Sequence, residues 1–408
     1  MLRRIVIENY RSCLKTSIDL DPQLSVLIGP NGSGKTNILQ AIMLLRKMHQ
    51  EDQIRRYGRS ANTPNAKLKA MFEPPRAQVS LNASVASRPD DSNNDVMVTS
   101  VQKWTIKALK RKPISVAMPL VVAAHLRDPA RAYHYARYWS IQHGRLTPPK
   151  EIPSWARDAL AKVFSFCDGI RYYGASQFTN PGACPASFEI EREGERSRLL
   201  RLHGHAKTLY NMYSAKKSTP DQYNKFIDIV GPKGLRLIDN LTFREVKTAS
   251  TEYSVRLGGK VEIRKRHNLL VIPRFKIGRQ ILSPNQLSEG TFKTLVLLFH
   301  IMTESSTALL VEEPEVCIHH GLLSSVLKLI KSYSRQKQMI LSTHSDYVLD
   351  HVKPENVYRV ALEKATGTVV NHIPKAMDSK ELSALRTYLE KEGNLGDYWR
   401  EGGLGDRP

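Results

Sequence analysis

The sequence predicts an α/β protein, with a mixed or parallel sheet built from both ends of the chain and a basic α+β insertion between them. Short apolar runs typical of buried strands occur near the start, at residues 24–28, and near the end, at residues 308–311 and 338–342. A helical pattern follows each run, and strands that alternate with helices favour a parallel sheet. The central residues lack this alternation, which separates them from both ends.

The N-terminal segment, residues 1–95, begins with alternating apolar and polar residues that predict a strand. The strand at residues 24–28 ends in a glycine-rich loop, and residues 37–45 continue as a helix. The remainder of this segment is rich in Pro, Asn, Ser and Arg, so we expect surface loops around one strand at residues 79–85.

The central segment, residues 96–280, is predicted to contain helices and a β-hairpin. Capping residues and prolines indicate helices at residues 128–142, 153–166 and 218–230. Alternation over residues 241–277, interrupted by Gly258 and Gly259, predicts the hairpin.

The C-terminal segment, residues 281–408, returns to strands that alternate with helices. Besides the two strands, helices are predicted at residues 292–302, 320–333 and 379–391. The glycine-rich tail contains Tyr398, Trp399 and Leu404, and we expect these side chains to be exposed in an extended segment that docks on a partner.

The charge of the chain is basic and unevenly distributed along the sequence. The 408 residues include 61 Lys and Arg and 39 Asp and Glu, a net charge of +22, while the 41% hydrophobic content excludes a disordered polybasic chain. Residues 101–150 contain ten basic and one acidic residue, and residues 201–300 contain eighteen and seven. Most of the net positive charge is therefore located in the central segment, and little of it in either end.

Composition also excludes several classes of protein. No run approaches the ~18–20 consecutive apolar residues of a membrane helix, and the first residues lack the apolar core of a secretion signal. The four cysteines are scattered without a CxxC pair, so neither a zinc site nor a disulfide framework is indicated. We expect a cytoplasmic protein that does not interact with membranes.

A phosphate-binding loop, Gly29-Pro-Asn-Gly-Ser-Gly34-Lys35-Thr36, follows the first apolar strand. Its glycines let backbone N–H groups turn toward a phosphate, and the start of the next helix adds partial positive charge. Lys35 would bridge the β- and γ-phosphates, and the Thr36 hydroxyl would bind Mg²⁺. Because the required strand and helix flank the motif, ATP and Mg²⁺ are the predicted cofactors.

Two carboxylates, Glu312 and Glu313, follow the apolar strand at residues 308–311. Glu312 would hold Mg²⁺ through a water, and Glu313 would orient and polarise the water that attacks the phosphate. An acidic pair at a strand end also occurs as a charge cluster at a helix start. The phosphate loop upstream favours the catalytic interpretation.

Two further motifs concern the γ-phosphate. His344 ends the last apolar strand, 31 residues after Glu313, which leaves room for a helix and a return strand and would let it sense phosphate loss. Ser288 and Gly290 open an apolar helix and form a second anion site. One chain cannot easily aim that site at a phosphate on its own loop, so a second protomer is implied.

In this order the phosphate loop, Leu287-Ser-Glu-Gly290, the strand that ends in Glu-Glu-Pro-Glu, and Thr343-His-Ser345 resemble the motifs of an ABC-type ATPase. The opening Ile5-Val-Ile-Glu-Asn-Tyr-Arg-Ser12 is similar to the RecF/SMC branch. Within that branch the chain resembles ATPases of the overcoming-lysogenization-defect (OLD) type and their relatives in the Septu and PARIS antiphage systems. The motifs cover only residues 1–48 and 280–362.

The resemblance implies an ABC-ATPase head that hydrolyses ATP with Mg²⁺. Glu313 is the implied catalytic base, His344 the switch, and Thr36 and Glu312 the metal-binding residues. The implied nucleotide-binding residues are Asn31, Gly32, Ser33, Gly34, Lys35, Thr36, Asn37, Ser288 and Gly290. The last two would contact ATP on the opposite protomer, so that ATP closes a homodimer. Assembly of such dimers into a higher oligomer is an alternative that the sequence does not decide.

Three departures from the family pattern bear on function. Glu312 occupies a position where Asp is usual and is one methylene longer. Glu289 and Thr291 replace the Gly and Gln of transporter signatures, which weakens a transport interpretation. The loop that would couple the two sites of a dimer is altered at residues 316–320, and the glutamine-loop residue is unassigned.

The resemblance leads to a sensor and scaffold of a bacterial antiphage system that controls a separately encoded effector nuclease of the HNH or Toprim type. Only 64 residues follow His344, without an Asp-x-Asp, so we expect no fused Toprim nuclease. His203, His205 and Asn211 lack the context of an HNH unit. The alternative is a RecF-like, ATP-dependent DNA-binding factor of repair or recombination, and a transporter subunit is the third interpretation.

Cations interleave with aromatic residues in the central segment, as contact with a phosphate backbone and base stacking require. This pattern occurs at residues 107–113, 131–139 and 264–267. Residues 101–150 and 201–300 are therefore candidates for binding DNA or RNA. An acidic partner protein would fit the same surface, and each stretch alone also matches an ordinary solvated face.

Overall fold

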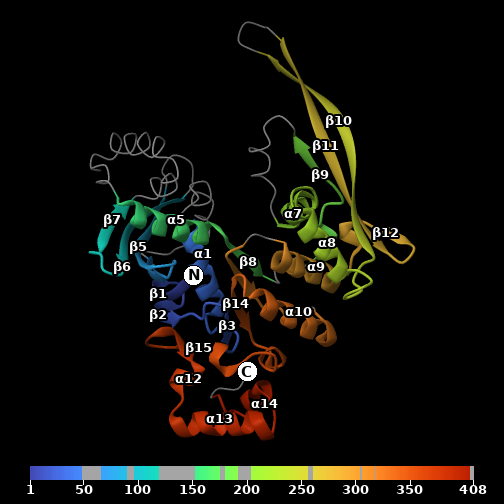
Figure 1. Cartoon of the computed structure of the whole chain (residues 1–408). Helices are drawn as coiled ribbons and strands as arrows, with labels where there is room; N and C mark the ends of the chain where they lie inside the picture. Colours follow the sequence, from blue (N-terminus) through green and yellow to red (C-terminus); the bar gives the residue numbers. More distant parts are fainter. Residues whose placement is uncertain are drawn as a thin grey trace. The chain divides into compact units, whose positions relative to one another are not determined.

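The chain divides into two compact units in the computed structural model (Figure 1). Unit 1 comprises Met1–Tyr172, Ser305–Glu313 and Ile330–Pro408, and unit 2 comprises Tyr173–Glu304 and Pro314–Leu329. The structure describes residues 1–47, 66–89, 96–118, 152–174, 180–191, 204–255, 261–303, 306–316 and 318–404. Among the helices in these ranges, none is long and apolar enough to cross a bilayer.

The central sheet of unit 1 has six strands in the order β16-β15-β3-β14-β13-β8. The strands are β3 (Leu24–Ile28), β8 (Ile170–Gly174), β13 (Ala308–Glu312), β14 (Gln338–Thr343), β15 (Val357–Glu363) and β16 (Gly367–His372). Strands β15, β3, β14 and β13 are parallel, and β16 is antiparallel to β15. Every residue of β3 and β14 is buried, as continuous apolar runs in a parallel sheet require. The predicted mixed sheet built from both chain ends is confirmed.

A second, antiparallel sheet in unit 1 has the order β2-β1-β4-β5-β6-β7. Its strands are β1 (Leu2–Tyr10), β2 (Cys13–Asp19), β4 (Ala66–Phe72), β5 (Ala77–Pro89), β6 (Val96–Ala108) and β7 (Ile114–Met118). The sequence predicted β1 and part of β5. Helix α5 (Ser154–Asp168), predicted at residues 153–166, packs on this sheet through Phe164, whose ring lies 5.2 Å from that of Trp104.

The predicted domain boundary after residue 95 is wrong. Strand β6 begins at Val96 and pairs with β5 along its whole length, from Pro89↔Val96 to Ala77↔Ala108. The Pro- and Asn-rich residues that were expected to end the first domain connect two paired strands. Residues 96–118 therefore continue the N-terminal sheet, and the basic central segment is divided between the two units.

Helix α1 (Lys35–Lys47) carries the end of the phosphate loop into the core of unit 1. Ile38, Leu39, Ile42 and Leu45 are buried, at a spacing that places them toward one side of the helix. They belong to the same apolar core as residues of β1, β13 and β14. Burial of this face fixes the position at which α1 starts. It thereby also fixes the positions of Lys35 and Thr36, the first two residues of the helix.

The prediction of an exposed, extended C-terminal tail is also wrong. Trp399 and Leu404 are 1% and 4% exposed, and Tyr398 packs on Tyr388 with ring centroids 5.1 Å apart. The helices of this region are α11 (Asp346–Leu349), α12 (Ile373–Ala376), α13 (Ser379–Lys391) and α14 (Leu395–Arg400). A Cβ on Gly396 would lie 2.3 Å from an oxygen of the Asp350 carboxylate, so this glycine permits close packing instead of flexibility.

Unit 2 combines a four-stranded sheet with packed helices. The strands are β9 (Phe188–Glu191), β10 (Asn240–Val255), β11 (Val261–Ile277) and β12 (Gln280–Leu282), and the helices are α7 (Gly204–Ser218), α8 (Pro220–Val230) and α9 (Glu289–Met302). Helix α10 (His320–Tyr333) begins in unit 2 and ends in unit 1. Phe226 and Phe299 join α8 to α9 with centroids 5.6 Å apart.

The predicted hairpin is confirmed as the long ribbon of β10 and β11 (Figure 1). The two strands pair without a slip from Asn240↔Lys276 to Val255↔Val261. The predicted helices at residues 218–230, 292–302, 320–333 and 379–391 are confirmed as α8, α9, α10 and α13. The helix predicted at residues 128–142 and the turn at Gly258 lie outside the described residues.

Candidate active site

The phosphate loop connects β3 to α1 at the carboxyl end of the parallel strands. Gly29, Gly32 and Gly34 have φ of +152°, +80° and +104°, which residues with a Cβ rarely adopt. A Cβ on Gly34 would lie 2.1 Å from Thr368 Oγ1, and one on Gly29 would lie 2.1 Å from the Val360 carbonyl oxygen. Glycine is therefore required at these two positions by space as well as by conformation.

Lys35 lies folded onto this loop. Its Nζ donates to the carbonyl oxygens of Gly29, at 2.7 Å, and Pro30, at 3.0 Å, and the residue is 6% exposed. A buried ammonium group needs such acceptors to offset the loss of water. The contacts hold a positive charge within a loop of the kind that binds phosphate.

Two buried hydroxyls near the strand ends have no hydrogen-bond partner among the described residues. They belong to Ser33, in the loop, and to Ser342, which is opposite Glu312 in the pairing of β14 with β13. Ser33 is 2% exposed and Ser342 is 1% exposed. Buried polar atoms are nearly always hydrogen-bonded, so unpaired hydroxyls here fit a site that receives a polar ligand such as a triphosphate.

A chain of hydrogen bonds supports the loop from β16. Asn37 Nδ2 donates to Ser12 Oγ at 2.7 Å, Ser12 Oγ is bonded to Thr368 Oγ1 at 2.7 Å, and Thr368 Oγ1 donates to the Ser33 carbonyl at 3.1 Å. Asn37 Oδ1 also accepts from Arg11 at 3.3 Å. Asn37 was predicted to bind nucleotide, and in the structure its side-chain amide joins this supporting network.

The two residues predicted to hold the metal contact each other. Thr36 Oγ1 donates to Glu312 Oε1, and the second carboxylate oxygen, Oε2, accepts from the hydroxyl of Tyr172 on β8. A hydroxyl and a carboxylate are oxygen ligands of the type that Mg²⁺ prefers beside phosphate and water. Tyr172 was not predicted, because its role depends on β8 lying beside β13, a tertiary pairing that no local motif announces.

Glu313 and His344, the predicted base and switch, also lie together. The separation between His344 Nδ1 and Glu313 Oε1 is 3.3 Å, and both side chains are partly exposed, at 41% and 32%. Glu313 has φ of +47°, a left-handed conformation that costs roughly 1–2 kcal/mol for a residue with a Cβ. Its N–H donates to the Ser342 carbonyl at 2.9 Å, which fixes this turn at the strand end.

Ser288 and Gly290 belong to unit 2, whereas the loop, Glu312 and His344 belong to unit 1. Ser288 is the N-cap of α9 and accepts from the Thr291 N–H at 3.2 Å. Ser288 is exposed and Gly290 is partly exposed. The structure thus brings the predicted residues of unit 1 together and places the other two at the accessible start of α9, a helix that is buried from Phe292 to Met302.

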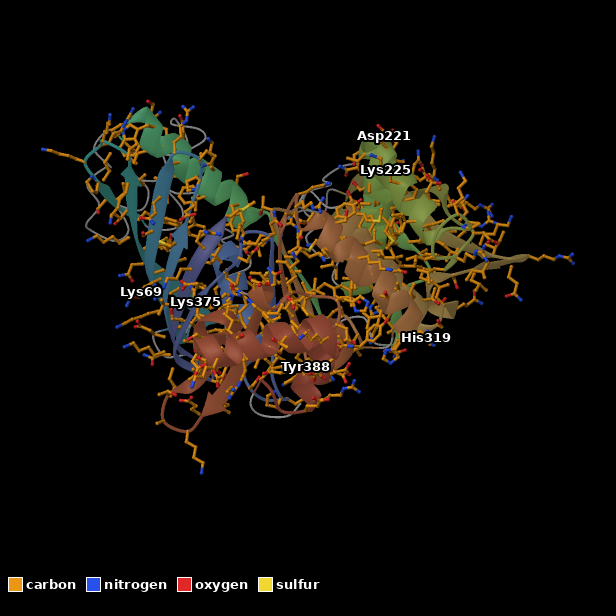
Figure 2. The ribbon with its side chains drawn as sticks, turned by 60° about the horizontal axis from the view of Figure 1, so that its bottom comes forward. Lys69, Asp221, Lys225, His319, Lys375 and Tyr388 are labelled. Atoms are coloured by element: carbon orange, nitrogen blue, oxygen red, sulfur yellow. The ribbon has the colours of Figure 1, made fainter. Side chains whose placement is uncertain are left out.

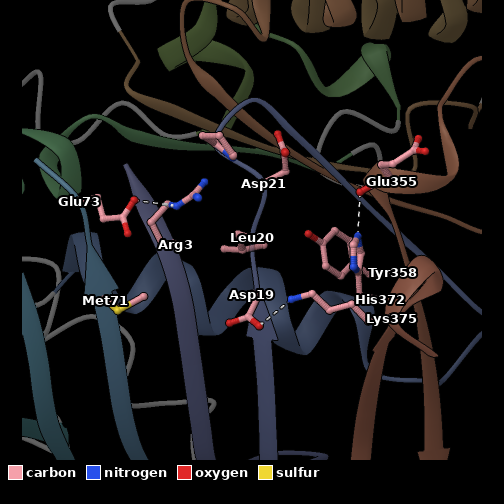
Figure 3. A pocket seen from close by; sticks show the side chains of 11 residues that line it. Arg3, Asp19, Leu20, Asp21, Met71, Glu73, Glu355, Tyr358, His372 and Lys375 are labelled. Carbon is pink, nitrogen blue, oxygen red and sulfur yellow. Dashed lines mark hydrogen bonds and ion pairs between the residues drawn. The ribbon is translucent and has the colours of Figure 1, made fainter. Parts of the chain in front are cut away.

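A cavity of about 520 Å³ lies at the other end of the parallel strands of unit 1, away from the phosphate loop (Figure 3). Asp21 precedes β3 and Glu355 precedes β15, so both are at the amino ends of parallel strands, whereas the phosphate loop follows a carboxyl end. The Arg3 and Glu73 side chains that line the cavity pair with each other at 3.0 Å. This cavity is therefore separate from the candidate active site.

The predicted basic stretches are only partly described. Residues 107–113 run from the end of β6 toward β7, and Arg111 is exposed and lies 5.1 Å from the centre of the Trp155 ring. Residues 131–139 lie outside the described residues, as do the side chains of residues 264–267. In unit 2, Asp221 and Lys225 both project from α8 (Figure 2).

Comparison with known proteins finds two families of ATPase domains. The family described as "AAA ATPase domain" matches residues 1–114, and the family described as "AAA domain, putative AbiEii toxin, Type IV TA system" matches residues 193–350. The first match spans the phosphate loop, and the second spans the signature, both glutamates and His344. The phosphate loop, the signature, the two glutamates and His344 thus fall within ranges that match ATPase-domain families.

Curated relatives match short stretches of the chain. The DNA replication and repair protein RecF of Vibrio vulnificus is 39% identical over 80 residues, which cover 16% of this chain and 22% of that protein. RecF of Lactococcus lactis is 31% identical over 93 residues, covering 21% and 24%. The DNA double-strand break repair Rad50 ATPase of Methanopyrus kandleri is 50% identical over 44 residues, covering 11% and 5%. The chain therefore aligns with less than a quarter of each relative's length.

Solved structures of SMC head domains align over most of the chain. The head domain from Thermotoga maritima has a TM-score of 0.41 at 15% identity and covers 91% of this chain and 98% of its own. The Smc head from Pyrococcus furiosus, bound to the C-terminal domain of ScpA, has a TM-score of 0.41 at 13% identity and covers 94% and 99%.

The loop geometry, the paired glutamates and the two domain matches together support an ATPase domain with a phosphate loop over residues 1–114 and 193–350. Part of the chain is also similar in sequence to RecF and Rad50 proteins.

Proposed function

We propose that the chain binds and hydrolyses ATP as the sensor and scaffold of a bacterial antiphage system, and that it controls a separately encoded effector nuclease. The observation that carries the ATPase proposal is the arrangement around the phosphate loop. Thr36 contacts Glu312, and Glu313 lies 3.3 Å from His344. Transfer of a phosphoryl group to water requires residues that hold Mg²⁺, a base that activates the water, and a group that contacts the γ-phosphate.

In this proposal each residue acts at a defined place. Lys35 and the loop N–H groups bind the β- and γ-phosphates, and Thr36 and Glu312 hold Mg²⁺, which neutralises phosphate charge when bound. Glu313 accepts a proton from the attacking water, and His344 donates to the γ-phosphate. The Glu313 carboxylate is partly exposed, so a water can reach it.

The signature residues Ser288 and Gly290 act on the nucleotide of a second protomer. Their helix start is exposed and its N–H groups carry partial positive charge, which favours an anion. ATP then closes a homodimer with two nucleotides between the subunits. Hydrolysis removes the γ-phosphate that both subunits contact, and the dimer opens.

The defence role is supported by the resemblance to OLD-type ATPases and by the family that matches residues 193–350, whose description names a toxin of a toxin–antitoxin system. A RecF-like function in DNA repair or recombination is supported about as well, because the RecF and Rad50 relatives are described as repair proteins. Binding of DNA or RNA by the basic residues belongs to either proposal.

The ATPase proposal is tested by Glu313→Gln, with Glu315→Gln, two residues further along the chain, as the matched control. We expect Glu313→Gln to lower turnover about 100-fold or more while ATP affinity stays within about twofold. Light scattering should then show a dimer that persists with ATP. Unchanged turnover would exclude Glu313 as the base.

The two cellular roles are separated by phage infection and by DNA binding. In the defence role, cells that express the chain with its neighbouring gene resist phage, and Glu313→Gln removes the resistance. In the repair role there is no resistance, and the chain binds gapped duplex DNA in a manner that requires ATP and weakens steeply with salt.

A further inference from the structure

The carboxylate of Glu312 is held by hydroxyl groups on two sides. Thr36 donates to Oε1 from the start of α1, and Tyr172 donates to Oε2 from β8, the strand next to β13 in the sheet. These hydrogen bonds are partly shielded from solvent. Both oxygens of the proposed metal ligand are therefore fixed by neighbouring elements of unit 1.

The contact with Tyr172 restricts a side chain that is longer than the one usual at this position. A glutamate has one more rotatable bond than the aspartate usual at this position, and fixing it costs more conformational entropy. A threonine hydroxyl has one proton and two lone pairs, so Thr36 can donate to Glu312 and still offer a lone pair to a metal. Tyr172 reaches the other oxygen from a rigid ring and restricts the extra bond.

We propose that Tyr172 is a positioning residue of the metal site. Its hydroxyl orients the Glu312 carboxylate so that Thr36, through its hydroxyl, and Glu312, through a water, would hold Mg²⁺ together. This inference rests on the proposed ATPase function. Groups that hydrogen-bond to metal ligands set the orientation of those ligands, and their loss typically lowers metal affinity or activity about 10–100-fold.

The next residue supplies a matched control. Tyr173 is 1% exposed, and its hydroxyl donates to the Lys293 carbonyl oxygen at 3.2 Å. Tyr173→Phe therefore removes a phenol hydroxyl from the adjacent position without removing a bond to Glu312. An effect that both variants share reports a loss of packing or stability, and an effect of Tyr172→Phe alone reports the metal site.

The first test measures metal binding directly. Mn²⁺ is titrated by electron paramagnetic resonance into the full chain with a non-hydrolysable ATP analogue. We expect Tyr172→Phe to raise the half-saturating Mn²⁺ concentration about tenfold or more. Tyr173→Phe should leave it within about twofold of wild type, and both variants should keep their affinity for the nucleotide in EDTA. An unchanged Mn²⁺ titration in Tyr172→Phe overturns the inference.

The second test uses Glu312→Asp, whose shorter side chain withdraws the carboxylate from Tyr172. In that background Tyr172→Phe should change the Mn²⁺ titration by less than about twofold, because the two substitutions remove the same interaction. Equal effects in both backgrounds contradict the inference. If wild type neither binds Mn²⁺ with the analogue nor hydrolyses ATP, the proposed function itself fails, which is a distinct outcome.

Discussion

The two units place their candidate functional residues in opposite environments. In unit 1, Lys35 is buried, Thr36 and Glu312 contact each other, and β16 supports the phosphate loop through Thr368. In unit 2, Ser288 is exposed, and its hydroxyl hydrogen-bonds to Thr291 in the first turn of its own helix. The residues proposed to bind the nucleotide of their own chain are thus held by other elements of unit 1, whereas Ser288, which is proposed to act on a second protomer, is accessible.

The charges of the two units do not follow this contrast. By sequence, unit 1 has a net charge of +13 over 260 residues and unit 2 has +9 over 148. The basic blocks at residues 101–150 and 201–300 fall in different units. The two units therefore have a similar net charge per residue, although the charge is uneven along the sequence. Positive charge therefore does not mark unit 2 alone as a nucleic-acid-binding part.

Trp399→Ala tests whether the C-terminal tail belongs to the fixed part of unit 1. Because the side chain is 1% exposed, its removal should cost about 3–5 kcal/mol of unfolding free energy, by loss of buried area and creation of a cavity. Urea denaturation measures this cost. Tyr398→Phe is the control and should cost less than about 1 kcal/mol. A small cost for Trp399→Ala would restore the extended tail that the sequence predicted.

Gly34→Ala tests whether the phosphate loop is fixed by its contact with β16. The new Cβ would lie 2.1 Å from Thr368 Oγ1, so the loop must shift, and ATP affinity should fall about 100-fold. Fluorescent ATP titration measures the affinity. Gly32→Ala is the control, because φ is also positive there but no atom lies within 4 Å. If both variants lose ATP affinity equally, the backbone conformation of the loop explains the loss, and the contact with β16 does not.

Ser288→Ala tests the open site of unit 2. The substitution removes the N-cap of α9, which should cost about 1 kcal/mol of stability. ATP affinity of the monomer should stay within about twofold, while turnover should fall about tenfold because the dimer closes less well. Thr291→Val is the control, since it removes the hydroxyl bonded to Ser288 but keeps the backbone cap. A fall in monomer affinity equal to the fall in turnover would place Ser288 at the nucleotide of its own chain.

Strong periodicity and capping made much of the fold predictable. Continuous apolar runs identified β3 and β14, and the Ser-Thr-Pro-Asp sequence at residues 218–221 marked the start of α8. The phosphate loop, Glu312, Glu313 and His344 were predicted from residue type, spacing and the strands that precede them. The contact of Thr36 with Glu312 and the proximity of Glu313 to His344 agree with those assignments.

The features that were missed depend on tertiary contacts. Residues 96–118 join the N-terminal sheet because β6 pairs with β5, a pairing hidden by the loop-like composition between them. Gly396 read as a sign of flexibility, but it allows α14 to approach Asp350. Tyr172 carries no local signal for a role beside Glu312, because that role arises only when β8 lies next to β13.

The most direct test mixes two inactive variants, Lys35→Ala and Ser288→Arg, and measures ATP hydrolysis. If unit 2 of one protomer completes the site in unit 1 of another, half of the dimers in an equal mixture contain one intact site. The mixture should then recover about one quarter of the wild-type rate, although each variant alone is inactive. A mixture no more active than its components would contradict a shared site between protomers.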